Sequence, residues 1–230
     1  MPSVDPHANP DAAALDAALV AQALRIYRRY QLEFVEALNL CPWAERARLD
    51  GKVTERVLLH VQDFVTETLR VIDDLEAQEQ FEIGLLIYPQ LRVDRPQFDR
   101  KVADLGEAYR QRTEMHSPVF AMAAFHPDAP AVLTHAERLI PFIRRSPDPT
   151  IQLVRATALD RVREGSPEGT HFVDPASINL LTLPPKRDLP LRERIARANL
   201  RTIERVGVDA AEGILQSIFK DRDESYARIG

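Results

Sequence analysis

Four short apolar runs, separated by segments with helical spacing, constrain the fold of this chain more than any other feature. The runs are 53–61 (VTERVLLHV), 82–89 (EIGLLIYP), 118–127 (PVFAMAAFHP) and 150–156 (TIQLVRA). The segments between them, 63–78, 95–114 and 133–145, carry apolar residues at three- and four-residue steps, as amphipathic helices do. Because helical connections of this length join parallel strands, the pattern predicts an α/β layered fold with a four-stranded parallel or mixed sheet.

The segments on either side of this unit are predicted to be largely helical. Apolar spacing predicts a long N-terminal helix from residue 11 to about 40, which Pro42 ends. The C-terminal region is predicted to be helical with interruptions at Gly207 and Gly213, and it could pack on the sheet, exchange onto a partner or form a lid. The expected units are a flexible tail over 1–10, an α/β domain over 11–165, a proline-rich linker or loop over 166–189 and a C-terminal helical extension over 190–230.

Composition limits the classes of protein to which the chain could belong. It has 230 residues, 45% of them hydrophobic, and a formal net charge of −5. That balance suits a globular protein with a sizeable core and disfavours nucleic-acid binding, which needs clustered positive charge. No window approaches the ~18 uninterrupted apolar residues of a membrane span, and a single cysteine cannot form an internal disulfide. We therefore expect a cytoplasmic protein without membrane or nucleic-acid partners.

The only cysteine and the only tryptophan lie two residues apart in LNLCPWAERARLDG. Cys41 could be a nucleophile, a metal ligand or a redox-sensitive neighbour of a site, with Trp43 lining it. The carbonyl end of the preceding helix would raise the pKa of this thiol, although Arg46 and Arg48 could offset that effect. The alternative is that Cys41 is a small apolar residue of the core, a place where free cysteine is often found. A cysteine-phosphatase loop is excluded, because no arginine stands at the required spacing.

His126 is the strongest single candidate for proton transfer. It follows the apolar stretch 120–125 and precedes Pro127, so it should lie at the carboxyl end of a strand, where α/β sheets bind ligands. Histidine changes charge near neutral pH and could act there as a general acid or base. The alternative is a histidine that closes the turn through a backbone hydrogen bond.

Arginines gather in RRSPDPTIQLVR, the segment that leads into the fourth apolar run. Arg155 ends that run and would share the edge of His126 if the two strands are parallel, with Arg144 and Arg145 nearby. Guanidinium groups at such an edge could bind a carboxylate or phosphate, and Ser146 could donate to the same anion. Alternatively, Arg144 and Arg145 complement the dipole of the preceding helix, and Ser146 shapes the turn.

Common cofactor and metal motifs are missing from the chain. Its histidines and its cysteine lack the paired spacing of HExxH or CxxC sites, and none of its eight glycines forms a GxGxxG or GxxxxGK loop. We therefore predict no metal site from motifs and leave the cofactor open. A site assembled from Cys41, His126 and a carboxylate remains an alternative.

Three of these segments together resemble the bacterial family DUF1415, a domain of unknown function. LNLCPWA, AAFHPDAP and RRSPDPTIQLVRA occur in the same order and with similar spacing, and the resemblance covers roughly residues 20–165. Members usually have phenylalanine in place of Trp43, often tyrosine in place of Asp148, and histidine with leucine in place of Ile151 and Gln152. The resemblance implies the boundaries of the unit and carries no activity with it.

Two functions are compatible with these patterns. In the first, the protein is an enzyme for a small anionic metabolite. Arg155, helped by Arg145, would bind its carboxylate or phosphate, His126 would move a proton, and Cys41 would react or line the site. In the second, the chain is a non-catalytic ligand-binding or assembly module that forms homo-oligomers through its N- or C-terminal helices.

Overall fold

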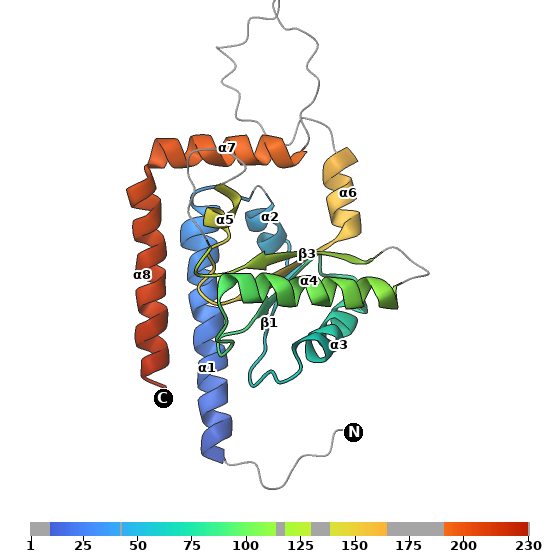
Figure 1. Ribbon diagram of the computed structural model, residues 1–230. Coiled ribbons are helices and arrows are strands. Elements are labelled where there is room, and N and C mark those ends of the chain that lie inside the picture. Colours follow the sequence, from blue (N-terminus) through green and yellow to red (C-terminus); the bar gives the residue numbers. More distant parts are fainter. Residues whose placement is uncertain (1–9, 42, 114–117, 130–138, 165–190, 230) are drawn as a thin grey trace, which may run out of the picture.

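The computed structural model describes residues 10–41, 43–113, 118–129, 139–164 and 191–229. The strands are β1 Val53–Val57, β2 Ile83–Ile87, β3 Phe120–Phe125 and β4 Thr150–Arg155. The helices are α1 Pro10–Arg29, the π-helix η1 Tyr30–Glu36, α2 Ala44–Leu49, α3 Phe64–Glu76, α4 Arg95–Arg112, α5 Ile140–Ile143, α6 Ala156–Glu164, α7 Leu191–Val206 and α8 Val208–Ala227 (Figure 1). Each strand of the structure therefore lies within the apolar run that predicted it.

The four strands form one mixed sheet in the order β1-β2-β4-β3. β1 and β2 are parallel, whereas β4 runs antiparallel to both β2 and β3. The predicted α/β layered fold with a four-stranded sheet is confirmed, in its mixed form. Because β1, β2 and β3 run in one direction, their carboxyl ends lie at one edge of the sheet, beside the first residues of β4. We call this the carboxyl edge.

Helices cover both faces of the sheet, so the central strand β2 is buried along its whole length (Figure 1). α3 and α4 pack on one face, where their side chains surround Leu86 and Leu153. α1, η1 and α8 cover the other face and meet Leu85 and Ile87. This alternation along β2 explains why its sequence is apolar at every position rather than at every second one.

Both helices of the first face begin near the carboxyl edge with capped N-termini. Asp63 accepts the backbone N–H of Thr66 at 3.1 Å at the start of α3. Asp94 accepts the N–H of Gln97 at 2.7 Å, and the Gln97 side chain accepts the N–H of Asp94 in return. These contacts satisfy donors that a helix start leaves unpaired. The loops after β1 and β2 are therefore fixed at their far ends.

The N-terminal helix differs from its prediction in its last turns. α1 ends at Arg29, and the chain continues as the π-helix η1 instead of an α-helix to residue 40. Tyr30 and Phe34 of η1 are almost completely buried. Apolar residues at three- and four-residue steps do not distinguish an α-helix from a short π segment, which explains the difference. The chain then turns at Asn39, whose φ is +50°.

One of the two predicted interruptions in the C-terminal region is present. Gly207 separates α7 from α8 with a φ of +90°, which glycine adopts without strain, so this prediction is confirmed. The interruption predicted at Gly213 is wrong, because Gly213 lies inside α8. A glycine costs a helix only about 1 kcal/mol, and the burial of Leu215 and Phe219 on the same helix outweighs that cost.

α8 packs along α1 and joins the same apolar core as the sheet (Figure 1). Leu215 and Ile218 are fully buried in that core. At the rim, the Asp221 carboxylate pairs with Arg25 at 2.7 Å and with Arg29 at 2.5 Å. The C-terminal helices therefore complete the layer that covers one face of the sheet.

Some sequence predictions concern residues that the structure does not describe. The tail over 1–9 and the proline-rich segment 166–189 lie outside the described ranges, as does residue 42. Of the helix predicted over 133–145, only α5 (Ile140–Ile143) with its flanking residues is described. Pro141 lies in the first turn of α5, where the missing N–H of proline costs no hydrogen bond.

Candidate functional site

The carboxyl edge brings together loops that are far apart in the sequence. The backbone N–H of Tyr88, after β2, donates to Pro149 O at 3.0 Å, and that of His126, after β3, donates to Arg144 O at 3.0 Å. The segment before β4 therefore lies between the ends of β2 and β3. This edge contains four of the residues selected from the sequence, His126, Arg144, Arg145 and Ser146.

His126 is buried and makes two side-chain hydrogen bonds. Its side chain is 1% exposed and its ring lies 5.7 Å from that of Phe98. Nδ1 accepts the backbone N–H of Asp128 at 3.1 Å, so Nε2 carries the proton and donates to Val93 O at 3.0 Å. Burial lowers the pKa of His126 and keeps the ring neutral. Both ring nitrogens are occupied, which is the geometry of the turn-closing alternative.

Arg144, Arg145 and Ser146 lie close to His126 but have contacts within the protein. The Arg145 guanidinium pairs with Glu212 of α8 at 2.6 Å and donates to Pro127 O at 3.3 Å. The Arg144 guanidinium stacks over the Phe125 ring at 5.5 Å. Ser146 is fully buried, and its hydroxyl donates to Asp148 O at 2.5 Å. Ser146 therefore shapes the turn before β4, as its alternative interpretation states.

Arg155 lies at the opposite end of the sheet. Its expected place beside His126 is wrong, because it required parallel strands and β4 is antiparallel to β3, pairing Arg155 with Phe120, the first residue of β3. The guanidinium donates to the carbonyl oxygens of Phe81, Leu75 and Gln78 at 3.0, 3.1 and 3.3 Å. Two of these carbonyls belong to the C-terminal turn of α3 and its continuation, which a cation stabilises.

Cys41 lies between η1 and α2, near the buried hydroxyls of Tyr27 and Tyr30. Burial raises the pKa of the Cys41 thiol, and the backbone N–H groups of Trp43 and Ala44 oppose part of this increase. These amides were not predicted from the sequence, because only the helix before Cys41 was predicted. The helix α2, which begins directly after this turn, was not. Trp43 is the N-cap residue of α2, and it is half-buried. Tyr30 lies within electrostatic reach of both Cys41 and Arg144.

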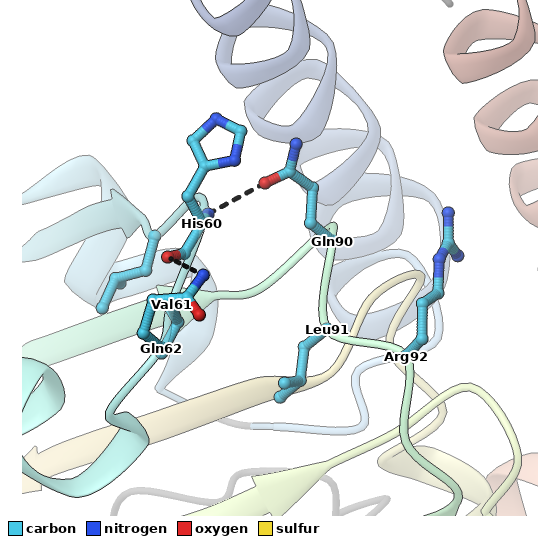
Figure 2. A pocket seen from close by; sticks show the side chains of 7 residues that line it. His60, Val61, Gln62, Gln90, Leu91 and Arg92 are labelled. Carbon is cyan, nitrogen blue, oxygen red and sulfur yellow. Dashed lines mark hydrogen bonds between the residues drawn. The ribbon is translucent and has the colours of Figure 1, made fainter.

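A pocket of about 400 Å³ opens at the carboxyl edge, between the loop after β1 and the loop after β2 (Figure 2). Figure 2 shows the side chains of His60, Gln90 and Arg92 pointing to one side, and that of Leu91 pointing to the other. The lining residues are Leu58, His60, Val61, Gln62, Gln90, Leu91 and Arg92. They include a guanidinium, an imidazole and two amides, and none of the seven carries a carboxylate.

His60 is held at this pocket by contacts from two other elements. Its Nε2 lies 2.8 and 3.0 Å from the two carboxylate oxygens of Asp16 on α1. Its backbone N–H donates to Oε1 of Gln90 at 2.9 Å. The backbone φ of His60 is +54°, a conformation that residues other than glycine adopt only uncommonly. The ring itself is 60% exposed, in contrast to His126.

Arg92 lines the pocket and is also within electrostatic reach of a buried carboxyl group. The Tyr226 hydroxyl donates to Asp148 Oδ2 at 2.7 Å, and Asp148 is 4% exposed. Burial raises the pKa of Asp148, and the Tyr226 hydroxyl and the guanidinium groups of Arg222 and Arg92 oppose part of that rise. Arg92 is exposed and within electrostatic reach of this pair, so its charge is available at the surface of the pocket.

Two absences hold for the part of the chain that the structure describes. No group of three or more histidine, cysteine, aspartate or glutamate side chains is arranged to hold a metal ion there. Within the same residues, no helix is long and apolar enough to cross a membrane.

The fold and this edge define a three-layer α/β protein with a pocket at the carboxyl ends of two parallel strands. A family model described as "Protein of unknown function (DUF1415)" matches residues 23–181, and the chain belongs to this family. No curated protein and no solved structure matches the chain. His60, Gln90 and Arg92 lie within the matched residues, whereas Asp16 and α8 lie outside them.

Proposed function

We propose that this protein binds a small anionic metabolite in the cytoplasm, in the pocket formed by the loops after β1 and β2. The observation that carries this proposal is the polar lining of the pocket, which has Arg92 and His60, two glutamine amides and no carboxylate. A guanidinium group offers paired donors that match the oxygens of a carboxylate or phosphate. The lining therefore favours an anion over a neutral or cationic ligand.

The place and the size of the pocket support this proposal. Open α/β sheets bind ligands outside the carboxyl ends of their strands, because the loops there converge on one crevice. About 400 Å³ lies within the range of ordinary small-molecule sites, which is roughly 300–1,000 Å³. The N-termini of α3 and α4 also face this edge. Since Asp63 and Asp94 cap them, the charge that binds the anion is that of Arg92.

Titration calorimetry with inorganic phosphate and with succinate tests the proposal. We expect the wild type to bind at least one of these anions and Arg92→Gln to bind it about tenfold more weakly, a loss of about 1.4 kcal/mol. Arg110→Gln is the matched control, because Arg110 is an exposed arginine near the C-terminal end of α4, where it pairs with Glu107. Affinity that is equal in the wild type and Arg92→Gln, or binding of neither anion by the wild type, would refute the site.

A further inference from the structure

We propose that His60 and Asp16 form a general-base pair that makes this pocket a hydrolytic site for small esters carrying a carboxylate or phosphate. The inference rests on the proposed function, because Arg92 must hold the anionic end of the ester. It adds the reacting groups and the class of substrate. No residue of the pair was selected from the sequence.

The first argument is the hydrogen bonding of the imidazole ring. A carboxylate only accepts hydrogen bonds, so the contacts of 2.8 and 3.0 Å to Asp16 place the proton of a neutral His60 on Nε2. The lone pair of the neutral ring is then on Nδ1. Within the described residues Nδ1 has no hydrogen-bond partner, and Figure 2 shows it turned toward Gln90. A base that is oriented by a carboxylate and has its other nitrogen free can accept a proton.

The second argument is the backbone of His60. A non-glycine residue with a φ of +54° is held in a sparsely populated backbone conformation. Here the Gln90 side chain fixes the backbone through the bond to the His60 N–H at 2.9 Å. The same conformation places the ring between α1 and the pocket. Such outliers cluster at functional sites, where position matters more than local stability.

The third argument is the contrast with His126, which follows β3, the strand on the other side of the sheet that runs in the same direction as β1. His126 is 1% exposed and uses both ring nitrogens, whereas the His60 ring is 60% exposed. Only His60 can reach water and a ligand together. Of the described histidines at this edge, it is the one that can carry out proton transfer.

The reaction that follows needs only water as a second reactant. A water molecule gives a proton to Nδ1 of His60 while its oxygen bonds to the ester carbonyl carbon. The tetrahedral intermediate then breaks the bond to the alcohol oxygen, which takes the proton back from Nδ1. Asp16 accepts the Nε2–H throughout and stabilises the imidazolium that forms, so it is a positioning residue. An acid and an alcohol are released, and no oxidant or reductant is consumed.

Hydrolysis of two nitrophenyl esters tests this inference. We expect the wild type to hydrolyse mono-4-nitrophenyl succinate with a kcat/KM about tenfold above that for 4-nitrophenyl acetate, because only the first ester carries a carboxylate for Arg92. His60→Gly should lower kcat about 100-fold. Since glycine adopts positive φ without strain, this variant should fold, and added imidazole should restore much of the rate.

Two further variants separate the roles of Asp16 and Arg92. Asp16→Asn should lower kcat about tenfold at unchanged KM, because the ring loses its orienting carboxylate while the anion site is intact. Arg92→Gln should raise KM for the succinate ester about tenfold, so that the preference for the succinate ester over the acetate ester is lost. Asp104→Asn, on the exposed face of α4, is the matched control and should behave like the wild type.

The outcomes distinguish this inference from the proposed function. If phosphate or succinate binds through Arg92 but His60→Gly hydrolyses the succinate ester as fast as the wild type, the general-base pair is wrong and the anion site stands. If neither anion binds but hydrolysis depends on His60, the general-base pair stands, whereas the anion site and the substrate class that rests on it are wrong. If hydrolysis is independent of His60 and no anion binds, both are wrong.

Discussion

Arg155 is expected to stabilise the fold and not to bind a ligand, and its replacement tests this. Its guanidinium makes three hydrogen bonds of 3.0 to 3.3 Å with carbonyl oxygens, and it lies 4.8 Å from the centre of the Phe120 ring. Hydrogen bonds to a charged group each contribute about 1.5–3 kcal/mol, and a cation–π contact adds about 0.5–1 kcal/mol. Arg155→Gln can replace one of the three bonds. The loss of two bonds and of the cation–π contact amounts to about 3.5–7 kcal/mol, and because Arg155 is only half-buried we expect the free energy of unfolding to fall by an amount near the lower limit, about 3.5 kcal/mol.

Urea unfolding, followed by circular dichroism, measures this loss. With a denaturant dependence of about 3 kcal/mol per molar urea, the midpoint should fall by about 1 M. Arg161→Gln is the control, because Arg161 is 60% exposed and its pair with Glu82 should contribute under about 1 kcal/mol. Phosphate or succinate binding by Arg155→Gln should equal that of the wild type. A loss below about 1 kcal/mol, or a loss of anion binding, would refute the structural role.

Two further predictions concern stability. Because burial lowers the pKa of His126 below its value of about 6.5 in the unfolded chain, the unfolded state binds more protons below that pH, and stability should fall as the pH falls from 7 to 5. Urea unfolding should show a weaker pH dependence for His126→Asn than for the wild type, and equal dependence would contradict the argument. Leu215→Ala should cost about 2–5 kcal/mol of global stability, measured by the same unfolding, because Leu215 is fully buried in the core shared by α8 and the sheet. Val208→Ala, on the exposed part of α8, should cost much less, and equal effects would show that α8 does not stabilise the sheet domain.

The strands could be predicted from the sequence, but the direction of β4 could not. Apolar runs report burial, and β2 is buried at every position as its run predicts. Direction depends on how the connection between β3 and β4 returns to the sheet, and a segment of helical length allows either course. Because β4 is antiparallel to β3, Arg155 lies at the end of the sheet opposite the carboxyl edge. There its charge is paired with carbonyl groups in the last turn of α3 and directly after it.

Only part of the candidate site could be predicted from the sequence. His60 follows β1 as His126 follows β3, so the argument that selected His126 applied equally to His60. It was not applied, because His60 was included in a predicted strand that in fact ends at Val57. Asp16 had no local signal at all, since it lies 44 positions before His60 and meets it only through the packing of α1 against the sheet.

Packing therefore decides which of two equivalent histidines is available for chemistry. At the end of β3, the Phe98 side chain of α4 and the Val93 carbonyl of the loop before α4 contact His126, which is closed off from solvent. At the end of β1, α1 approaches from the other face with the Asp16 carboxylate, so Nε2 is held, while Nδ1 has no hydrogen-bond partner among the described residues. A structural histidine needs partners for both nitrogens, whereas a proton-transfer histidine needs a partner for one. By that criterion the proposed reaction belongs to the pocket beside β1 and not to the His126 turn.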